Sequence, residues 1–266
     1  VLGILNVTRD SCSDGGRHLD VADAVAHGRA LIAAGADIID LGAESTHPDA
    51  EDVPAEEEIA RLVPVIRALR ADGVRISVDT YKPAVMRAVL ALGVDIINDV
   101  TALRDPEAVA VLRDGSARVI LMHSTAASAR AERINVSAET IVPRIVDFFR
   151  RRGDELETAG IRRERLILDP GMGFFLGRDP RVSLTVLRQL PRLAELGLPL
   201  CVSTSRKSFI GSLLETDEHP RAVEQRGAGT LATELWAARH GVEYIRTHDV
   251  RALRDALCIW KALESE

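Results

Sequence analysis

The sequence predicts an α/β fold in which residues 1–266 form one domain, a single-domain (β/α)8 TIM barrel. Eight short apolar runs recur along the chain, and most neighbouring runs are separated by a segment with helical periodicity. The alternative, an open doubly wound sheet, needs a glycine-rich fingerprint after its first strand, and neither GxGxxG nor a GxxxxGK motif occurs. A length of 266 residues suits one barrel.

The apolar runs are typical of fully buried parallel strands. Three of them follow one pattern, a glycine, a small residue, an acid and two apolar residues, and the copies end on Asp40, Asn98 and Arg246. A polar residue therefore closes each of these strands at the edge where parallel folds bind ligands. The predicted strands are Leu2–Val7, Ala36–Leu41, Arg75–Asp79, Val94–Asn98, Arg118–Met122, Arg165–Asp169, Leu198–Ser203 and Val242–Arg246.

The clearest helix begins at Pro54 and carries three acidic residues, Glu56, Glu57 and Glu58, in its first turn. Proline and acids suit this position because the first N–H groups of a helix are free and its dipole is positive there. The other predicted helices are Val21–Ala34, Pro83–Leu92, Glu139–Ala159, Val182–Leu196, Ala222–His240 and Val250–Leu263.

Charge and composition exclude several classes of function. Lys and Arg number 34 against 40 Asp and Glu, a net charge of −6, and aromatic residues make up 3%, which argues against a nucleic-acid binder. No apolar stretch approaches membrane-span length, and no signal-peptide pattern occurs, so we expect no membrane association. The three scattered cysteines fit a reducing compartment, and we expect a cytoplasmic protein with small-molecule partners.

Polar residues follow nearly every predicted strand, and we expect them to converge into one pocket. Taken singly, buried polar groups mostly serve structure, so the prediction depends on their convergence. The candidates are Asn6, Asp40, Glu44, Asp79, Asn98, Met122, His123, Asp169, Ser205, Lys207, Arg246 and His248.

These residues divide into two subsites of opposite character. Asp79, Asn98 and Asp169 offer acceptors and one amide, which suit a flat heterocycle with ring N–H and amino groups. A second set offers donors and positive charge, which suit a phosphate or carboxylate: Arg246, His248, Lys207 and Asn6. Together they indicate a phosphorylated heterocycle.

Covalent hydrolysis is not favoured by the sequence. Ser205 has no adjacent histidine, and the G-x-S-x-G elbow is absent. Transfer chemistry with a good leaving group is therefore the preferred reaction class. We expect the loops at residues 6–16 and 42–50 to close over substrate, and Ser124–Arg133 to be a solvated lead-in to a helix.

Both loops and five further motifs resemble the dihydropteroate synthase family over essentially the whole chain. The further motifs are Ser77–Lys82 (SVDTYK), Ile97–Val100 (INDV), Leu168–Phe174 (LDPGMGF), Ser205–Phe209 (SRKSF) and Arg246–Val250 (RTHDV). The resemblance implies a pterin-binding barrel and a transferase of folate biosynthesis. Such enzymes join 6-hydroxymethyl-7,8-dihydropterin diphosphate to 4-aminobenzoate, release diphosphate and use Mg2+.

The family's site residues map onto both subsites. The resemblance implies that diphosphate leaves first and that the aniline nitrogen then attacks a pterin-methyl cation. The implied catalytic residues are Asp79, Asp169, Lys207 and Arg246. Pterin would contact Asp79, Asn98, Met122, Asp169, Lys207 and Arg246. Diphosphate would contact Asn6, Thr46, Arg246 and His248, with Asn6 also at the metal. The 4-aminobenzoate would contact Thr46, Pro48, Phe174, Ser205 and Lys207.

The chain departs from the usual family pattern at Arg9, Cys12, Ala43, His47 and Phe175–Leu176. Histidine at position 47 replaces the usual arginine and carries less positive charge at neutral pH, which weakens the expected contact with diphosphate. Several departures resemble the sulfonamide-resistant members of the family. We therefore expect an active synthase, and we hypothesise that sulfonamides do not inhibit it.

Two other functions stay open at this point. One is a methyltetrahydrofolate-dependent methyltransferase domain, which shares the barrel and the pterin pocket. The other is a pterin-binding paralogue without synthase activity. This alternative is suggested by Cys12 and His47, which depart from the usual family pattern. The resemblance also implies a homodimer, whereas residue type alone predicts that Leu235, Trp236 and Trp260 belong to the core.

Overall fold

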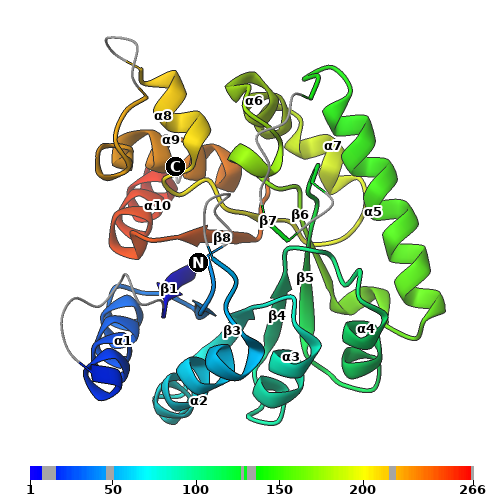
Figure 1. Cartoon of the computed structure of the whole chain (residues 1–266). Helices are drawn as coiled ribbons and strands as arrows, with labels where there is room; N and C mark the ends of the chain where they lie inside the picture. Colours follow the sequence, from blue (N-terminus) through cyan, green and yellow to red (C-terminus); the bar gives the residue numbers. More distant parts are fainter. Residues whose placement is uncertain (8–15, 46–50, 127–128, 131–135, 216–219, 265–266) are drawn as a thin grey trace.

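The computed structural model in Figure 1 describes the whole chain except residues 8–15, 46–50, 127–128, 131–135, 216–219 and 265–266. Eight parallel strands form a sheet of order β6-β5-β4-β3-β2-β1-β8-β7. The sheet closes because Leu168 and Leu200 form a bridge between its two edges, and the Leu168 N–H donates to the Pro199 carbonyl at 2.8 Å. The helices lie outside the strands, which confirms the predicted (β/α)8 barrel.

All eight predicted strands occur, and two have the predicted bounds. The strands are β1 (Leu2–Asn6), β2 (Ile38–Gly42), β3 (Arg75–Asp79), β4 (Ile96–Asp99), β5 (Arg118–Met122), β6 (Leu166–Asp169), β7 (Cys201–Val202) and β8 (Tyr244–Thr247). The prediction is least accurate for β7, which has two residues where we expected Leu198–Ser203. This strand lies where the barrel closes through the single Leu168–Leu200 bridge.

The helices that cover the barrel include two that were not predicted, α4 and α8. The predicted Val182–Leu196 is in fact two helices, because Pro191 lacks an N–H and stands at the start of the second one. The helices are α1 (Gly16–Ala33), α2 (Ala55–Ala71), α3 (Pro83–Leu90), α4 (Pro106–Arg113), α5 (Ile141–Thr158), α6 (Pro180–Arg188), α7 (Leu190–Ala194), α8 (Ser208–Leu213), α9 (Gly227–Arg239) and α10 (Val250–Glu264).

An apolar layer fills the amino-terminal half of the barrel interior. It contains one side chain from each of six strands: Leu2, Ile38, Ile96, Ile120, Ile167 and Cys201. Alternate residues of a strand share a face, so Ile4 and Asn6 point the same way as Leu2, but nearer the carboxyl edge. The polar part of the described interior therefore lies toward the carboxyl edge.

A second and larger apolar cluster fills the space between the strands and the surrounding helices. It includes Leu5 and Leu41 from the outward faces of β1 and β2, and Leu62 and Leu69 from α2. Among the described residues, no helix combines the length and hydropathy that a membrane span requires.

Candidate active site

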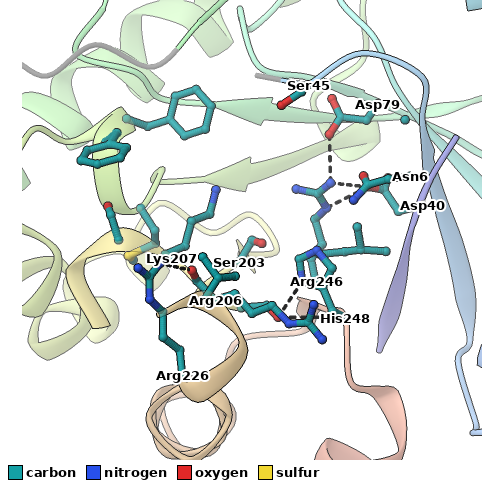
Figure 2. Close-up of a pocket in the computed structure, with 18 of the residues that line it drawn as sticks. Asn6, Asp40, Ser45, Asp79, Ser203, Arg206, Lys207, Arg226, Arg246 and His248 are labelled. Carbon is teal, nitrogen blue, oxygen red and sulfur yellow. Dashed lines mark hydrogen bonds and ion pairs between the residues drawn. The ribbon is translucent and has the colours of Figure 1, made fainter. Parts of the chain in front are cut away.

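A cavity of about 710 Å³ opens at the carboxyl edge of the barrel, between strand ends that are distant in sequence (Figure 2). The predicted convergence is confirmed for most of the candidates. Those that line the cavity are Asn6, Asp40, Glu44, Asp79, Ser205, Lys207, Arg246 and His248, and Phe174, which the resemblance implies as an aminobenzoate contact, lines it as well.

Three predicted pterin contacts lie at the same edge but deeper in the protein. Asn98, Met122 and Asp169 are buried at the ends of β4, β5 and β6, and Asn98 is paired in register with Asp79. The Asn98 Nδ2 atom has no hydrogen-bond partner within the described part of the chain. Buried amides are normally hydrogen-bonded, so this unsatisfied donor keeps Asn98 a candidate contact for a ligand. Thr46 and Pro48 lie outside the described residues.

Arg246 is held between two carboxylates that come from different strands (Figure 2). Its Nε donates to Asp40 Oδ2 at 2.9 Å, and its terminal nitrogen donates to Asp40 and, at 2.9 Å, to Asp79 Oδ2. Asp40 fixes the Arg246 guanidinium, because β1 is the only strand between β2 and β8 and the two inward side chains meet across it.

The same cluster makes Asp79 unusually easy to protonate. Burial raises the pKa of Asp79 to about 7, the charge of Asp40 adds to the increase, and Arg246 opposes it. For Arg246, burial acts to lower the pKa, but Asp40 and Asp79 together raise it above its usual value. The guanidinium therefore stays charged while one carboxyl beside it can take up a proton near neutral pH.

Lys207 contributes a second cation to the cavity, and its side chain is half-buried. Burial and the charge of Arg246 lower the pKa of Lys207 to about 8. Its Nζ lies 5.0 Å from the centroid of the Phe175 ring, within the range of a cation–π contact. Burial also raises the pKa of Asp169, although its Oδ1 accepts a hydrogen bond from the Gly171 N–H at 2.8 Å.

Ser205 has a histidine partner that the sequence did not reveal. Its Oγ lies 2.9 Å from His248 Nδ1 and accepts the His248 backbone N–H at 3.1 Å, although the two residues are 43 positions apart. Ser205 has no histidine near it in the sequence, but the fold places His248 beside it, so the expectation was wrong in three dimensions. Because the Ser205 oxygen already accepts the backbone N–H, we assign its proton to His248 Nδ1, which leaves the Nε2–H of a neutral ring as a donor.

This pair is a poor nucleophile and base. Burial and the positive charges of Arg206, Arg246 and Lys207 lower the pKa of His248 to about 4, so the ring has little tendency to take a proton from Ser205. The low pKa of His248 is therefore the physical reason to expect no covalent hydrolysis at this pair.

Several cavity residues were missed by the sequence reasoning, among them Ser203, Arg206, Ser208, Met172 and Arg226. Arg206 and Ser208 belong to the Ser205–Phe209 motif, which was a usable signal. Arg226 reaches the cavity from the start of α9 and donates to the Arg206 carbonyl at 2.8 Å, which no sequence pattern indicates.

The donor set suits Mg2+ that is held mainly by a substrate. Within the described chain, no group of three or more His, Cys, Asp or Glu residues could hold a metal ion. Asn6 lines the cavity and offers a hard amide oxygen. Mg2+ keeps several waters and binds through one or two protein ligands plus phosphate oxygens, so a single amide beside a bound diphosphate fits it.

Known proteins are similar to this chain over nearly its whole length. A family model described as a pterin binding enzyme matches residues 2–248. The type-3 dihydropteroate synthase of Escherichia coli is 45% identical over 99% of this chain and 98% of its own. The chain belongs to the dihydropteroate synthase family. The type-2 enzyme of E. coli is 46% identical over 99% of this chain and 96% of its own.

Solved structures of dihydropteroate synthases share the whole fold. The Xanthomonas albilineans enzyme with 4-aminobenzoic acid superposes with a TM-score of 0.89 at 43% identity and covers 100% of this chain and 93% of its own. A complex of the same dihydropteroate synthase with 7,8-dihydropteroate gives a TM-score of 0.86 at 42% identity, with the same coverage.

Proposed function

We propose that this chain condenses 6-hydroxymethyl-7,8-dihydropterin diphosphate with 4-aminobenzoate to give 7,8-dihydropteroate and diphosphate. The observation that carries the proposal is the cluster of Asp40, Arg246 and Asp79 beside Lys207, in a cavity at the barrel's carboxyl edge. The cluster combines acceptors for a heterocycle with fixed cations for a leaving anion. Relatives that cover nearly the whole chain carry the same activity in their names.

In this proposal the deep residues bind the pterin. Asp79 and Asp169 accept hydrogen bonds from its ring N–H and amino groups, while Asn98 offers a free amide donor and Met122 packs against the ring. The carboxylates also stabilise the positive charge that develops on the pterin methylene carbon as its bond to diphosphate breaks. Lys207 holds the ring from the opposite wall.

The outer residues bind the leaving group. Arg246 and the Nε2–H of His248 donate to diphosphate oxygens, and Asn6 is the residue that would hold Mg2+ there, with Thr46 as the expected fourth contact. When bound, Mg2+ neutralises charge on the departing diphosphate. A fixed guanidinium needs no reorganisation when the C–O bond breaks, because Asp40 already holds it in place.

The 4-aminobenzoate is placed at the mouth of the cavity. Phe174 offers an apolar surface for the aromatic ring and Lys207 offers a positive charge for its carboxylate, while Ser205, whose proton is donated to His248, lines the same subsite. Thr46 and Pro48 complete this subsite in the proposal. The aniline nitrogen then attacks the pterin methylene, loses a proton to solvent and forms the new C–N bond.

The direct test is product formation by the purified protein. Incubation with the pterin diphosphate, 4-aminobenzoate and Mg2+ is expected to yield dihydropteroate and one equivalent of diphosphate, and removal of Mg2+ with a chelator is expected to slow the reaction. A methyltransferase domain or a pterin-binding paralogue would not form dihydropteroate. Binding of the pterin with no product would therefore overturn the proposal.

We also propose that the enzyme is insensitive to sulfonamides, on the basis of its departures from the usual family pattern. Phe175 and Leu176 replace the usual Gly-Lys, and the buried Phe175 forms part of the cavity wall beside Lys207. Sulfamethoxazole at concentrations comparable to 4-aminobenzoate is expected to leave turnover unchanged. Inhibition equal to that of a sensitive synthase assayed in parallel would contradict this.

A homodimer is proposed from the exposed face of the last two helices. Trp236 on α9 is 42% exposed and Ile259 on α10 is 63% exposed, so the prediction that Trp236 is a core residue was wrong. Arg239 lies 5.8 Å from the Trp260 ring and connects the two helices. Sedimentation is expected to show twice the chain mass, and the Ile259→Glu variant is expected to be monomeric. A monomeric native protein at micromolar concentration would refute the dimer.

A cytoplasmic location is proposed from the state of the cysteines. In the described part of the chain, Cys201 is buried and Cys258 is exposed, and both are free thiols. Fractionation of cells that produce the protein is expected to recover it in the cytoplasmic fraction, and recovery outside the cytoplasm would disprove the proposal.

A further inference from the structure

A second cluster of charged side chains lies beside the cavity and is not used in the proposed chemistry. It consists of Lys82, Glu44, Glu58, Tyr81 and Arg130, which we call the Lys82 cluster. Lys82 precedes α3, Glu44 follows β2, and Glu58 lies in the first turns of α2, so the cluster joins three segments. Of its members, Glu44 lines the cavity.

The Lys82 ammonium is the centre of this cluster. Its Nζ donates to Glu44 Oε2, to the Val53 carbonyl at 2.5 Å and to Glu58 Oε2 at 3.0 Å. The three side chains are almost fully enclosed, with 16%, 7% and 1% of the surface exposed for Lys82, Glu44 and Glu58. Charge pairs this well enclosed define a geometry far better than surface pairs do.

The contacts of Lys82 hold both ends of the segment that follows β2. Glu44 stands at the start of this segment and Val53 at its end, and the Val53 N–H also donates to Glu44 Oε2 at 3.4 Å. Two further residues support the same arrangement. Tyr81 Oη donates to Glu44 Oε1 at 3.1 Å, and Arg130 reaches Asp52 at 2.6 Å and Glu44 at 3.9 Å.

One of the two ends that Lys82 holds, the end at Glu44, belongs to the outer rim of the cavity. Glu44 and Ser45 line it beyond the end of β2 at Gly42, whereas Asp40, Asp79 and Arg246 lie within the strands. In the proposed reaction the pterin binds deep in the barrel and contacts the strand residues. The aminobenzoate binds at the mouth of the cavity, next to the rim. Displacement of the rim therefore affects the second substrate more than the first.

We infer that Lys82 is a positioning residue that fixes Glu44 and Ser45 for binding of the second substrate, the aminobenzoate. The inference rests on the proposed synthase activity. Lys82 does not touch the reacting atoms, since its three acceptors are Glu44, Val53 and Glu58. Its effect passes through Glu44, and misplacement of a binding group by about 1 Å is enough to lower catalytic efficiency up to about 100-fold.

The test separates positioning from general stability. Lys82→Met removes the ammonium that Glu44 and Glu58 share and threatens folding, so the double variant Lys82→Met/Glu58→Gln is the main probe, because it also removes one of the two buried negative charges. We expect the KM for 4-aminobenzoate to rise about 10- to 100-fold. Pterin affinity in the absence of aminobenzoate, followed by calorimetry, is expected to stay near that of the native enzyme.

Two controls complete the kinetic comparison. Lys82→Arg keeps a cation with several donors and is expected to restore most of the KM. Arg87→Met removes a basic side chain of α3 whose partner Glu107 is exposed, and it is expected to change nothing. An unchanged aminobenzoate KM in the folded double variant, or an equal loss of affinity for both substrates, would overturn the inference.

Hydrogen exchange does not require turnover, so it tests the role of Lys82 separately from the proposed synthase activity. Amide hydrogen exchange at Val53 is expected to accelerate in the double variant, because its acceptor Glu44 is no longer fixed. An inactive native enzyme would disprove the synthase and leave this exchange result standing. Unchanged exchange at Val53 would disprove the role of Lys82 whatever the activity.

Discussion

Replacing Arg246 with methionine is expected to cause the largest loss of activity of any single substitution. The guanidinium is the cation in the cavity that is held by two carboxylates and faces the proposed diphosphate site. Removal of one preorganised donor to a developing negative charge costs about 100- to 1000-fold in rate. We expect kcat/KM for the pterin diphosphate to fall by at least that factor.

The same substitution is expected to weaken the fold. It leaves Asp40, which is completely enclosed, and Asp79 without their positive partner, and such an uncompensated pair costs about 3–5 kcal/mol of unfolding free energy. Denaturant unfolding of Arg246→Met measures this cost. Adding Asp40→Asn to the variant removes one buried charge and is expected to restore part of the stability but none of the activity.

A matched control separates the general effect of losing an arginine from the specific effect of losing Arg246 in the cavity. Arg29→Met removes an arginine whose partner Asp72 lies at the protein surface, and it is expected to change neither rate nor stability measurably. Activity in Arg246→Met within tenfold of the native enzyme would mean that the leaving group is bound elsewhere.

The secondary structure was largely predictable because buried parallel strands have a strong local signal. Arg75–Asp79 and Arg118–Met122 were predicted to the residue: charged residues mark both ends of the first (RISVD), and the second (RVILM) is a continuous apolar run that begins after an arginine. Helix α8 has six residues, Ser208–Leu213, which is too short to show a helical period. Helix α4 was missed although Asp105 caps it and Pro106 begins it, which is a signal that sequence reasoning can use.

The chemistry of the site was predictable only in part, because the partners of its residues are distant in sequence. The edge on which the polar residues gather follows from strand direction alone. The contact between Arg246 and Asp40 spans 206 positions, and the contact between Ser205 and His248 spans 43. Neither pair can be found from spacing, since both depend on how the barrel closes.

The pH dependence of the native enzyme is expected to be bell-shaped. Asp79, with a pKa raised by burial to about 7, must be ionised to accept from the pterin, so kcat/KM is expected to fall as the pH drops below about 7. Lys207, with a pKa lowered by burial to about 8, must be protonated to act as a cation, so kcat/KM is expected to fall above about 8. Because these groups interact, the apparent pKa values of the two limbs belong to the cluster as a whole and not to Asp79 or Lys207 alone.

Substitution of Lys207 tests whether this residue is the group that titrates in the alkaline limb of the pH profile. Lys207→Met is expected to lower kcat/KM by about 100-fold, since it removes a cation from the binding site, and the remaining activity is expected to lose the fall above pH 8. Lys207→Arg keeps its charge at any pH the enzyme tolerates, so its activity is expected to persist to higher pH than that of the native enzyme. If Lys207→Met kept the alkaline limb, another group would titrate there. His248 is ruled out for that role because burial and its cationic neighbours lower its pKa to about 4, so that the ring is already neutral throughout the range.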